Sequence, residues 1–525
     1  MTTASPKKRM LIIAPLSSFS ADRTAERTRD RVIMSDEPVV RVASLAIATV
    51  AALIPDGLFD ITLCDEEIEF VDLDIDVDVV AITANVSQAQ RAIWMAKEFR
   101  SKGKTVIIGG PHVSLAPEIF EGVADAMVVG ELEPIAEKFF TDLHEGRLEA
   151  KYQGHKADMS TTPMPRWDLY PNSRAVSGVV QTSRGCPFEC NFCDVIQYLG
   201  RVQRHKPDEQ ILAEISRLYE IGYRHITLSD DNFTVYRKRS KALLTLLKNW
   251  NGAEGREPVS FQTQMSIDVA RDPELLALCN EAGLRLGFFG IESSSAEALT
   301  ESKKRQNLRV DLREECEKIV RAGVIPEAGL IVGFDSDGPD CFQRQFDFAM
   351  SLPVITFKVA VLVAPISTPL YDEMAKAGRI IESDISAQFP GGSDYQTNII
   401  PARMSREELA EGARWLFESL LRPENVLVRF KRLAELLQPA PWARDDPSHR
   451  VSVRPNISRA YLSVIAKWSR DASIRNLIGQ VRDLAQERPE IKNDLMDSLS
   501  HYLVVYDGIF STDDRRQLPR SVSRA

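Results

Sequence analysis

The first 150 residues alternate short apolar runs with segments whose apolar positions recur at helical spacing. The apolar runs are rich in Val, Ile and Leu, which is typical of buried strands. We expect strands at Arg9–Leu16, Asp60–Cys64, Val77–Thr83, Thr105–Ile108 and Ala126–Val129. The helical segments between them are Arg41–Ile54, Ser87–Ser101, Leu115–Glu121 and Glu133–His144. Strands and helices that alternate in this way predict a doubly wound parallel sheet.

A second alternating region runs from residue 176 to about 380, after a segment (151–175) whose prolines and turn formers predict a linker. Its strands are predicted at Val179–Thr182, His225–Ser229, Val259–Gln262, Arg285–Gly290, Glu327–Val332 and Thr356–Val363. Its helices are predicted at Asp208–Ile221, Arg237–Trp250, Pro273–Glu281, Val310–Arg321 and Asp340–Ser351. If these strand–helix units curl into a barrel, the functional groups lie at the carboxyl ends of the strands.

The remaining residues, 381–525, have helical periodicity. Helices are predicted at Ser405–Leu421, Pro423–Leu437, Ser458–Trp468, Ile474–Arg488 and Ile491–Val505. Their aromatic residues either line a bulky apolar substrate pocket or, as we favour, pack the helices together: Trp415, Phe417, Tyr461, Trp468, Tyr502 and Tyr506. Four arginines near the end predict a disordered tail: Arg515, Arg516, Arg520 and Arg524.

Composition narrows the functional classes. The 525 residues suggest two to four domains, and the net charge of −10 argues against a general nucleic-acid binder. No uninterrupted run of apolar residues is long enough to cross a membrane, and the start of the chain lacks the apolar stretch of a secretory signal. We therefore expect a cytoplasmic protein in a reducing environment.

Three cysteines in the run Ser183–Asp194 carry the strongest chemical signal: Cys186, Cys190 and Cys193. Three closely spaced thiolates can hold an iron–sulfur cubane by three of its irons, whereas electron-transfer clusters use four cysteines. Structural zinc needs a fourth ligand, and a Cys-x-x-Cys redox motif would leave Cys186 unexplained. Zinc and redox chemistry remain the weaker alternatives, and disulfides are not expected in this setting.

The Cys-x-x-x-Cys-x-x-Cys spacing, with Phe192 before the last cysteine, resembles the radical S-adenosylmethionine (SAM) superfamily. The resemblance implies that the three cysteines bind a [4Fe–4S] cluster whose open iron chelates SAM. It also implies a partial (β/α)6 barrel and SAM contacts at its strand ends. By resemblance, Asp230 and Asp231 reach the methionine ammonium and Glu292 reaches the ribose. The adenine would lie against residues from the cluster loop and the last two strands: Phe192, Gly329, Gly333 and Ala364.

The N-terminal region resembles the flavodoxin-like cobalamin-binding domain of cobalamin-dependent (class B) radical SAM enzymes. The resemblance rests on the strand ends Gly109-Gly110-Pro111-His112 and Gly130-Glu131-Leu132-Glu133 ahead of the cysteines. It implies that cobalamin contacts come from strand ends: Ser17, Asp65, Thr83, Gly109, Gly110, His112, Gly130 and Glu131. No Asp-x-His-x-x-Gly follows the first strand, so cobalt is not expected to take a histidine from that loop. His112 could substitute, although a structural role suits its turn better.

The expected architecture is α/β: a cobalamin-binding domain (1–150), the linker (151–175), a radical SAM core (176–380) and a helical region (381–525). The implied function is C-methylation of an unactivated carbon, with two SAM consumed per turnover and a low-potential donor such as flavodoxin or ferredoxin. The chain looks most like the hopanoid methylases, so an apolar polycyclic lipid and loose membrane contact are expected. A corrinoid-dependent cyclase or ring-modifying enzyme acting on tetrapyrroles, and a non-catalytic cobalamin or redox sensor, are the alternatives.

Overall fold

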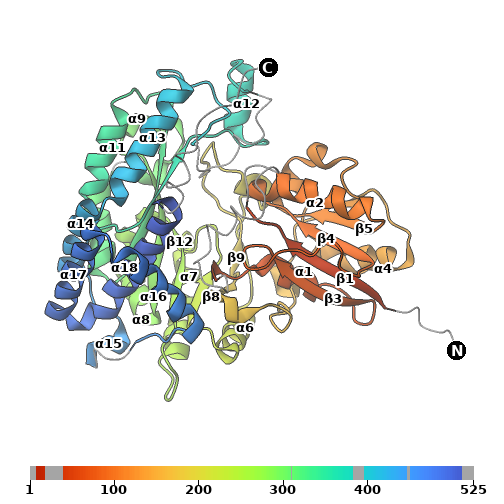
Figure 1. Ribbon diagram of the computed structural model, residues 1–525, viewed down its shortest axis with the longest axis horizontal. Helices are drawn as coiled ribbons and strands as arrows, with labels where there is room; N and C mark the ends of the chain where they lie inside the picture. Colours follow the sequence, from red (N-terminus) through yellow and green to blue (C-terminus); the bar gives the residue numbers. More distant parts are fainter. Residues whose placement is uncertain (1–6, 18–38, 309, 382–394, 446–449, 511–525) are drawn as a thin grey trace.

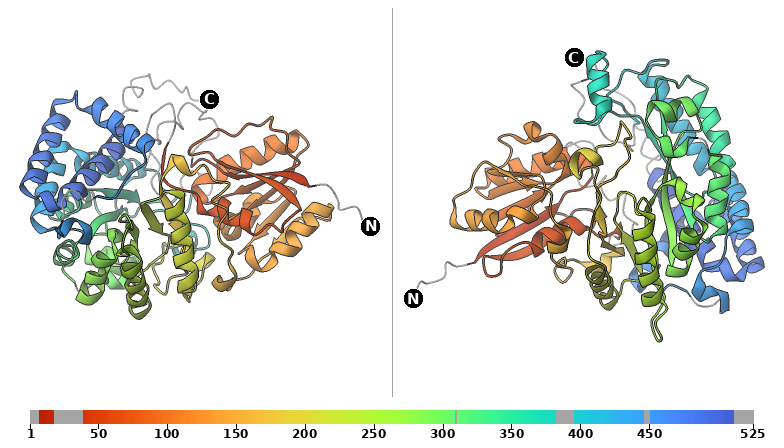
Figure 2. Two further views of the ribbon diagram at one scale, coloured as in Figure 1. Left: turned by 90° about the horizontal axis from the view of Figure 1, so that it is seen from below. Right: turned by 180° about the vertical axis from the view of Figure 1, so that it is seen from behind.

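The computed structural model describes residues 7–17, 39–308, 310–381, 395–445 and 450–510. Two lobes lie side by side, with the N-terminal lobe on the right of Figure 1 and the larger barrel lobe on the left. The views of Figure 2 show the same division. Each lobe is built on its own parallel sheet. The predicted tail arginines Arg515, Arg516, Arg520 and Arg524 lie outside the described residues.

The sheet of the N-terminal lobe has the order β3-β1-β4-β5-β6-β7 and is parallel throughout. Its strands are β1 (Lys8–Ala14), β3 (Phe59–Asp65), β4 (Val79–Thr83), β5 (Thr105–Gly109), β6 (Ala126–Val129) and β7 (Lys151–Gln153). Its first five strands follow the flavodoxin order, with β7 added at the edge. The predicted doubly wound, flavodoxin-like sheet is therefore confirmed.

Helices cover both faces of this sheet because its strands are apolar on both sides. The helices are α1 (Leu45–Ala52), α2 (Ala89–Ser101), α3 (Pro111–Leu115) and α4 (Ala136–Glu145). Alternate residues of β1 belong to different clusters: Met10 and Ile12 pack with α1 and α4, whereas Leu11 and Ile13 pack with α2. The carboxyl edge of the sheet is left uncovered by these helices and is available for a ligand.

The helix predicted at Arg41–Ile54 begins later than expected, so the prediction was wrong for its first residues. Val40–Val42 form strand β2, which pairs in parallel with β8 of the barrel lobe, and α1 begins only at Leu45. Two causes explain the strand. The β-branched valines on either side of Arg41 favour an extended backbone, and the edge of β8 provides hydrogen-bonding partners for it.

The barrel lobe contains a curled parallel sheet in the order β15-β14-β13-β12-β11-β8-β2. Besides β2, its strands are β8 (Ala175–Val180), β11 (His225–Leu228), β12 (Ser260–Met265), β13 (Leu284–Glu292), β14 (Ile325–Val332) and β15 (Phe357–Val361). The connecting helices are α6 (Asp208–Ile221), α7 (Arg237–Asn251), α8 (Pro273–Ala282), α9 (Ala296–Glu301), α10 (Leu312–Arg321) and α11 (Cys341–Met350). The sheet does not close, because β2 and β15 are its two edges. The partial barrel is confirmed.

The helical C-terminal region packs on the barrel. It comprises α12 (Pro369–Lys376), α13 (Arg406–Leu421), α14 (Pro423–Leu436), α15 (Pro441–Asp445), α16 (Pro455–Trp468), α17 (Ala472–Glu487) and α18 (Lys492–Phe510). In Figure 1, α13 and α14 lie on the side of the barrel lobe that is away from the N-terminal lobe. Trp468 of α16 packs edge-on against Tyr506 of α18, and Tyr502 of α18 is buried in the same cluster, as the packing interpretation predicts. No described helix is both long and apolar enough to cross a membrane.

The packing of α14 against the barrel can be tested with two substitutions on one helix. Phe430 is fully buried, in a cluster that also contains Val320 and Ile325 of the barrel, whereas Val428 is 53% exposed. We expect Phe430→Ala to lower the free energy of unfolding by about 3–5 kcal/mol, because a core cavity is left. Val428→Ala should change it by less than about 0.5 kcal/mol. Urea unfolding followed by circular dichroism measures both, and equal losses would contradict this packing.

Candidate functional site

The three cysteines lie on a loop, residues 185–203, whose ends are held together by two short strands. β9 (Ser183–Arg184) enters this cysteine loop and β10 (Arg204–His205) leaves it, and the two pair antiparallel. Gly185 has a φ of +100°, and a Cβ there would lie 2.8 Å from the carbonyl oxygen of Gly200. The Cys186 N–H donates to that same carbonyl at 3.2 Å. Glycine is required at 185 because the chain crosses itself there in a left-handed conformation.

The thiols are sheltered and suited to a metal cluster. Cys190 is buried, and Cys186 and Cys193 are half-buried. Burial raises the pKa of the Cys186 thiol and raises that of Cys193 to about 12, so both are neutral unless a metal replaces the proton. Among the described residues, no three His, Cys, Asp or Glu side chains are grouped to hold one metal ion. Three separated thiols fit a cubane, in which each cysteine ligates a different iron.

Lys304 is a functional candidate that the sequence interpretation missed. Its ammonium donates to the Glu292 carboxylate at 2.7 Å; Glu292 is buried and Lys304 is half-buried. Burial opposes the charge of Lys304, but Glu292 and the nearby Cys190 and Cys193 outweigh it and raise its pKa. A cation therefore lies beside the cysteine loop. The segment Lys303-Lys304-Arg305 looks like solvated surface in the sequence, and only the fold shows that Lys304 turns inward.

Glu292 ends β13 in a strained conformation, with a φ of +63°. The pairing of β13 with β14 shifts register between Gly290 and Glu292, and the absence of a side chain at Gly290 leaves room for the carboxylate. The Gln345 amide donates to the Glu292 carbonyl at 3.1 Å. A non-glycine residue held at positive φ costs free energy, and such residues gather at functional sites. The contact of Glu292 with a SAM ribose stays a prediction.

Asp230 and Asp231 both contact the chain that leads into the cysteine loop. Asp230 is buried and accepts the backbone N–H groups of Thr182 at 2.9 Å and Ser183 at 2.6 Å. Burial raises the pKa of Asp230 to about 6, and these hydrogen bonds limit the rise. Asp231 accepts the Gly185 N–H at 3.0 Å. Both carboxylates thus support the cysteine loop, and Asp231 also lines the cavity described below.

Phe192 and Ala364, predicted on the adenine side, belong to one small apolar cluster that also contains Phe334 and Leu362. Ala364 is fixed by two hydrogen bonds with the Asn398 side chain, of 2.9 and 2.8 Å. Gly329 lies within β14, on the face shared with Gly290. Gly333 follows that strand and donates its N–H to Asp337 at 2.9 Å. These four predicted residues therefore lie along the last two strands and the cysteine loop.

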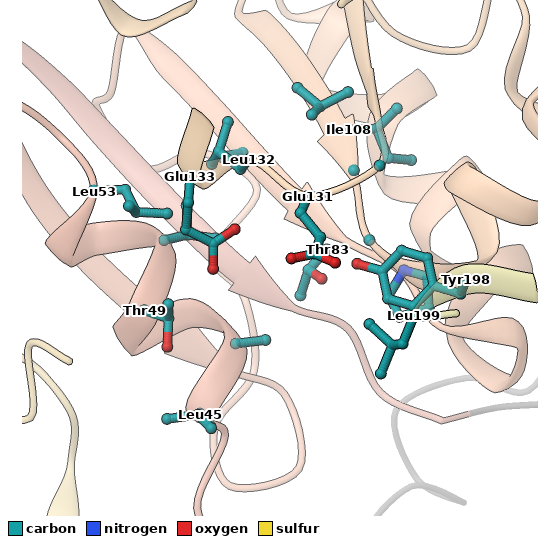
Figure 3. A pocket seen from close by; sticks show the side chains of 18 of the residues that line it. Leu45, Thr49, Leu53, Thr83, Ile108, Glu131, Leu132, Glu133, Tyr198 and Leu199 are labelled. Carbon is teal, nitrogen blue, oxygen red and sulfur yellow. The ribbon is translucent and has the colours of Figure 1, made fainter. Parts of the chain in front are cut away.

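A cavity of about 500 Å³ lies where the two lobes meet. The carboxyl edge of the first sheet supplies one wall, which includes Thr83, Gly109, Gly110, Gly130 and Glu131. The barrel lobe supplies the other, with Arg184, Asp194, Val195, Tyr198, Leu199, Ser229 and Asp231. In the view of Figure 3, Tyr198 and Leu199 lie beside Thr83 and Glu131, and Leu45, Thr49 and Leu53 lie on the opposite side. Burial raises the pKa of Tyr198 to about 12, so its phenol is neutral.

The glycine turn on the first wall allows a ligand to approach the backbone. Gly110 has a φ of +112°, and a Cβ there would lie 2.8 Å from the backbone of Ala84. Helix α1 adds Leu45, Thr49 and Leu53 to the lining. The cavity is lined mostly by apolar side chains, and at the glycine turn the backbone is not covered by side chains. Such a lining fits a flat, bulky ligand such as a corrinoid.

Three residues predicted to bind cobalamin are not among those that line this cavity: Ser17, Asp65 and His112. Asp65 is buried and accepts the Tyr170 hydroxyl at 2.7 Å. His112 is buried against the edge of Phe120, and burial lowers its pKa to about 4. These contacts agree with the structural role that the turn suggests for His112.

Glu131 is the centre of a buried ion-pair network that joins the two lobes. Arg204 donates to both of its oxygens, at 2.5 and 2.9 Å, and Arg184 donates at 2.7 Å. Arg184 also reaches Glu133 at 2.6 Å. Burial alone would raise the pKa of Glu131, but the hydrogen bonds from Arg204, the Ala157 N–H and Arg184 lower it. Both Glu131 oxygens are engaged, so a bound ligand meets an ion-paired carboxylate.

Two family profiles match the chain. One, described as the Radical SAM superfamily, matches residues 180–349, and the other, a domain of unknown function (DUF4070), matches residues 368–472. An uncharacterized methyltransferase of Synechocystis sp. is 33% identical over 432 residues, which cover 80% of this chain and 77% of that protein. The hopanoid C-2 methylase of Rhodopseudomonas palustris is 29% identical, covering 67% of this chain and 68% of that protein.

Solved structures share the fold. The methyltransferase TsrM from Kitasatospora setae, with cobalamin and a [4Fe–4S] cluster bound, aligns with a TM-score of 0.60 at 15% identity. That alignment covers 92% of this chain and 99% of TsrM. OxsB, with aqua-cobalamin and SAM bound, aligns with a TM-score of 0.59 at 14% identity over 99% of this chain and 82% of OxsB. The arrangement of two parallel sheets and C-terminal helices is thus shared along nearly the whole chain.

The cluster assignment can be tested by removing one thiol. Cys190→Ala should abolish the brown absorbance of the anaerobically reconstituted protein, because two thiolates do not retain a cubane. Cys316→Ala is the matched control, since that fully buried cysteine belongs to α10 and not to the cysteine loop. Its absorbance should match the unsubstituted protein. A cluster that survives in Cys190→Ala would contradict the assignment.

The network between the lobes predicts a large effect of one arginine. Arg184→Gln leaves the buried Glu133 unpaired and should destabilise the protein by about 3–5 kcal/mol, as expected for a broken buried pair. Arg166→Gln removes an arginine whose pair with Asp168 is exposed, and should cost at most about 1 kcal/mol. Urea unfolding of the two variants compares them directly. Similar small losses would show that the network does not hold the lobes together.

Proposed function

Because this chain belongs to the radical SAM methyltransferases, we propose that it transfers a methyl group from cobalamin to an unactivated carbon of an apolar substrate such as a hopanoid lipid. The observation that carries the proposal is the cavity between the lobes. One of its walls is a flavodoxin-type strand edge, and the other continues directly from the cysteine loop. A corrinoid held there would lie next to the cluster-bearing loop, on the route to the barrel interior.

The residues present fit the groups that the proposal requires. Cys186, Cys190 and Cys193 would hold the [4Fe–4S] cluster, and Glu292 and Lys304 lie beside them to orient SAM. Thr83, Gly109, Gly110 and Gly130 would contact the corrinoid. When bound, the cluster and SAM supply a carbon radical by hydrogen abstraction, and the corrinoid supplies the methyl group. The protein positions these partners and keeps the cysteine loop sheltered from water.

The proposal divides the chain as the sequence suggests. Residues 1–150 would bind cobalamin, apart from β2, which pairs with the barrel, and residues 151–175 would link the lobes, apart from β7, which extends the first sheet. Residues 176–380 would form the radical core, and residues 381–525 would support it. Methylation is favoured over the cyclase alternative because the relatives that cover most of the chain bear the names of methyltransferases. A low-potential donor such as flavodoxin or ferredoxin would reduce the cluster, in a reducing cytoplasm, and an apolar lipid would be drawn from a membrane surface.

Isotope labelling tests the proposal. The reconstituted protein, loaded with cobalamin and a reductant, is incubated with methyl-labelled SAM and an extract from a source strain that lacks the gene. We expect label in one extract component, with 5′-deoxyadenosine and S-adenosylhomocysteine formed in equal amounts. The Cys190→Ala protein serves as the control and should form no 5′-deoxyadenosine. Formation of 5′-deoxyadenosine without label transfer would refute methylation and favour the cyclase alternative.

A further inference from the structure

Lys358 lies on the inner face of the barrel sheet. Strand β15 alternates, with Phe357, Val359 and Val361 buried against the outer helices and Lys358 exposed on the opposite face. Its ammonium lies 4.8 Å from the centre of the Phe288 ring on β13, two strands away. Gly329 is the partner of Lys358 on the intervening strand β14 and has no side chain to separate them. The ammonium therefore extends across the open inner face.

The charge of Lys358 has no direct partner in the described part of the chain. Two charged groups act on it: the Glu327 carboxylate on β14 attracts it, and Arg41 on β2 repels it. Glu327 is already paired with Arg41 at 2.6 Å and with the His501 ring at 3.0 Å. Desolvation lowers the pKa of Lys358, and the attraction of Glu327 only partly offsets this. Since Lys358 is exposed on the inner face and no carboxylate of the described residues pairs with it, its ammonium is available to an anionic group of a ligand.

A second polar group shares this face. Gln264 of β12 is the register partner of Phe288, so it lies on the other side of the ring from Lys358. The Gln264 side chain is exposed and makes no hydrogen bond within the described residues. An amide N–H₂ and an ammonium thus flank one aromatic ring, and both can donate to an oxygen anion.

We propose that Lys358 and Gln264 bind a carboxylate of the substrate, so that the substrate is an apolar skeleton that bears one carboxylate and is not an uncharged hopanoid. The inference rests on the proposed methyl transfer and specifies the substrate class. Gly290 and Gly329 share a row of the inner face with Lys358, and Glu292 ends the neighbouring strand. A carboxylate docked at Lys358 therefore anchors the substrate below the groups that would orient SAM. One ammonium and one amide suit a carboxylate better than a phosphate, which arginine forks favour.

The first test determines the charge of the labelled product. We expect it to bind an anion exchanger at neutral pH and to be released when the eluent is acidified below about pH 4, where a carboxylate becomes neutral. Label in the neutral lipid fraction would overturn the inference and leave methyl transfer standing. Retention in acid would indicate a phosphate and overturn it as well. If no label is transferred at all, the proposed function fails and the inference fails with it.

The second test measures equilibrium binding by calorimetry, without turnover. The compound that accepts label is purified, and its methyl ester is prepared as an uncharged analogue. The unsubstituted protein should bind the acid about tenfold or more tightly than the ester, the range expected for a hydrogen bond to a charged group. Lys358→Gln should lose this preference, and Lys358→Arg should keep most of it. The control Lys248→Gln removes an exposed lysine paired with Glu281 and should bind both as the unsubstituted protein does.

The ester comparison separates recognition from folding. A structural defect would weaken the acid and the ester equally, so a preference that survives in Lys358→Gln would overturn the inference. If Lys358→Gln and Lys358→Arg lost the preference for the acid to the same extent, the inference would also be overturned, because the positive charge would then not be the cause of the preference. Gln264→Leu should lower the preference by less than Lys358→Gln, since a neutral hydrogen bond contributes less than a charged one.

Discussion

The contact between Glu131 and the two arginines of the barrel lobe is the constraint on which the site depends. Glu131 follows β6 of the first sheet, whereas Arg184 and Arg204 flank the cysteine loop on paired strands. Glu131 is buried and the two arginines are half-buried, so a displacement of the lobes would leave the desolvated carboxylate without its partners. The carboxyl edge of one sheet is thereby fixed against the entrance to the other. The shape of the cavity between the lobes therefore depends on the ion pairs of Glu131 with Arg184 and Arg204.

Most of the architecture could be predicted from the sequence because it is carried by local periodicity. Five of the six strands of the first sheet, and the barrel strands other than β2, were expected within a few residues of their observed bounds. The exceptions are β7, which lies in the segment predicted as a linker, and β2. Three residues around Arg41 are too few to show a period, and their strand pairing depends on β8, more than 130 residues away. A short strand of that kind is defined by its partner and not by its own pattern.

The candidate site divides in the same way. The cysteine motif and the glycine turns consist of residues that are close together in the sequence, so they could be recognised there. In the structure the cysteines lie on one loop and the glycine turns lie on one wall of the cavity. Lys304 and Arg184 could not be recognised, since a lysine or arginine in a sequence looks like surface until its carboxylate partner is known. Asp65 and His112 illustrate the converse. Both stand at strand ends, yet the contacts of Asp65 with Tyr170 and of His112 with Phe120 show how a strand end can serve packing.

The short strand β2 has a consequence for how the lobes relate as folding units. The chain begins in the first sheet with β1, crosses to pair β2 with the barrel, and returns through α1 to continue the first sheet with β3. The two lobes are therefore interleaved along the chain and are not consecutive. A gene fragment that encodes only the first lobe would carry an orphan barrel strand in its midst. A fragment that begins at the linker would leave β8 as a bare edge, open to pairing with another molecule.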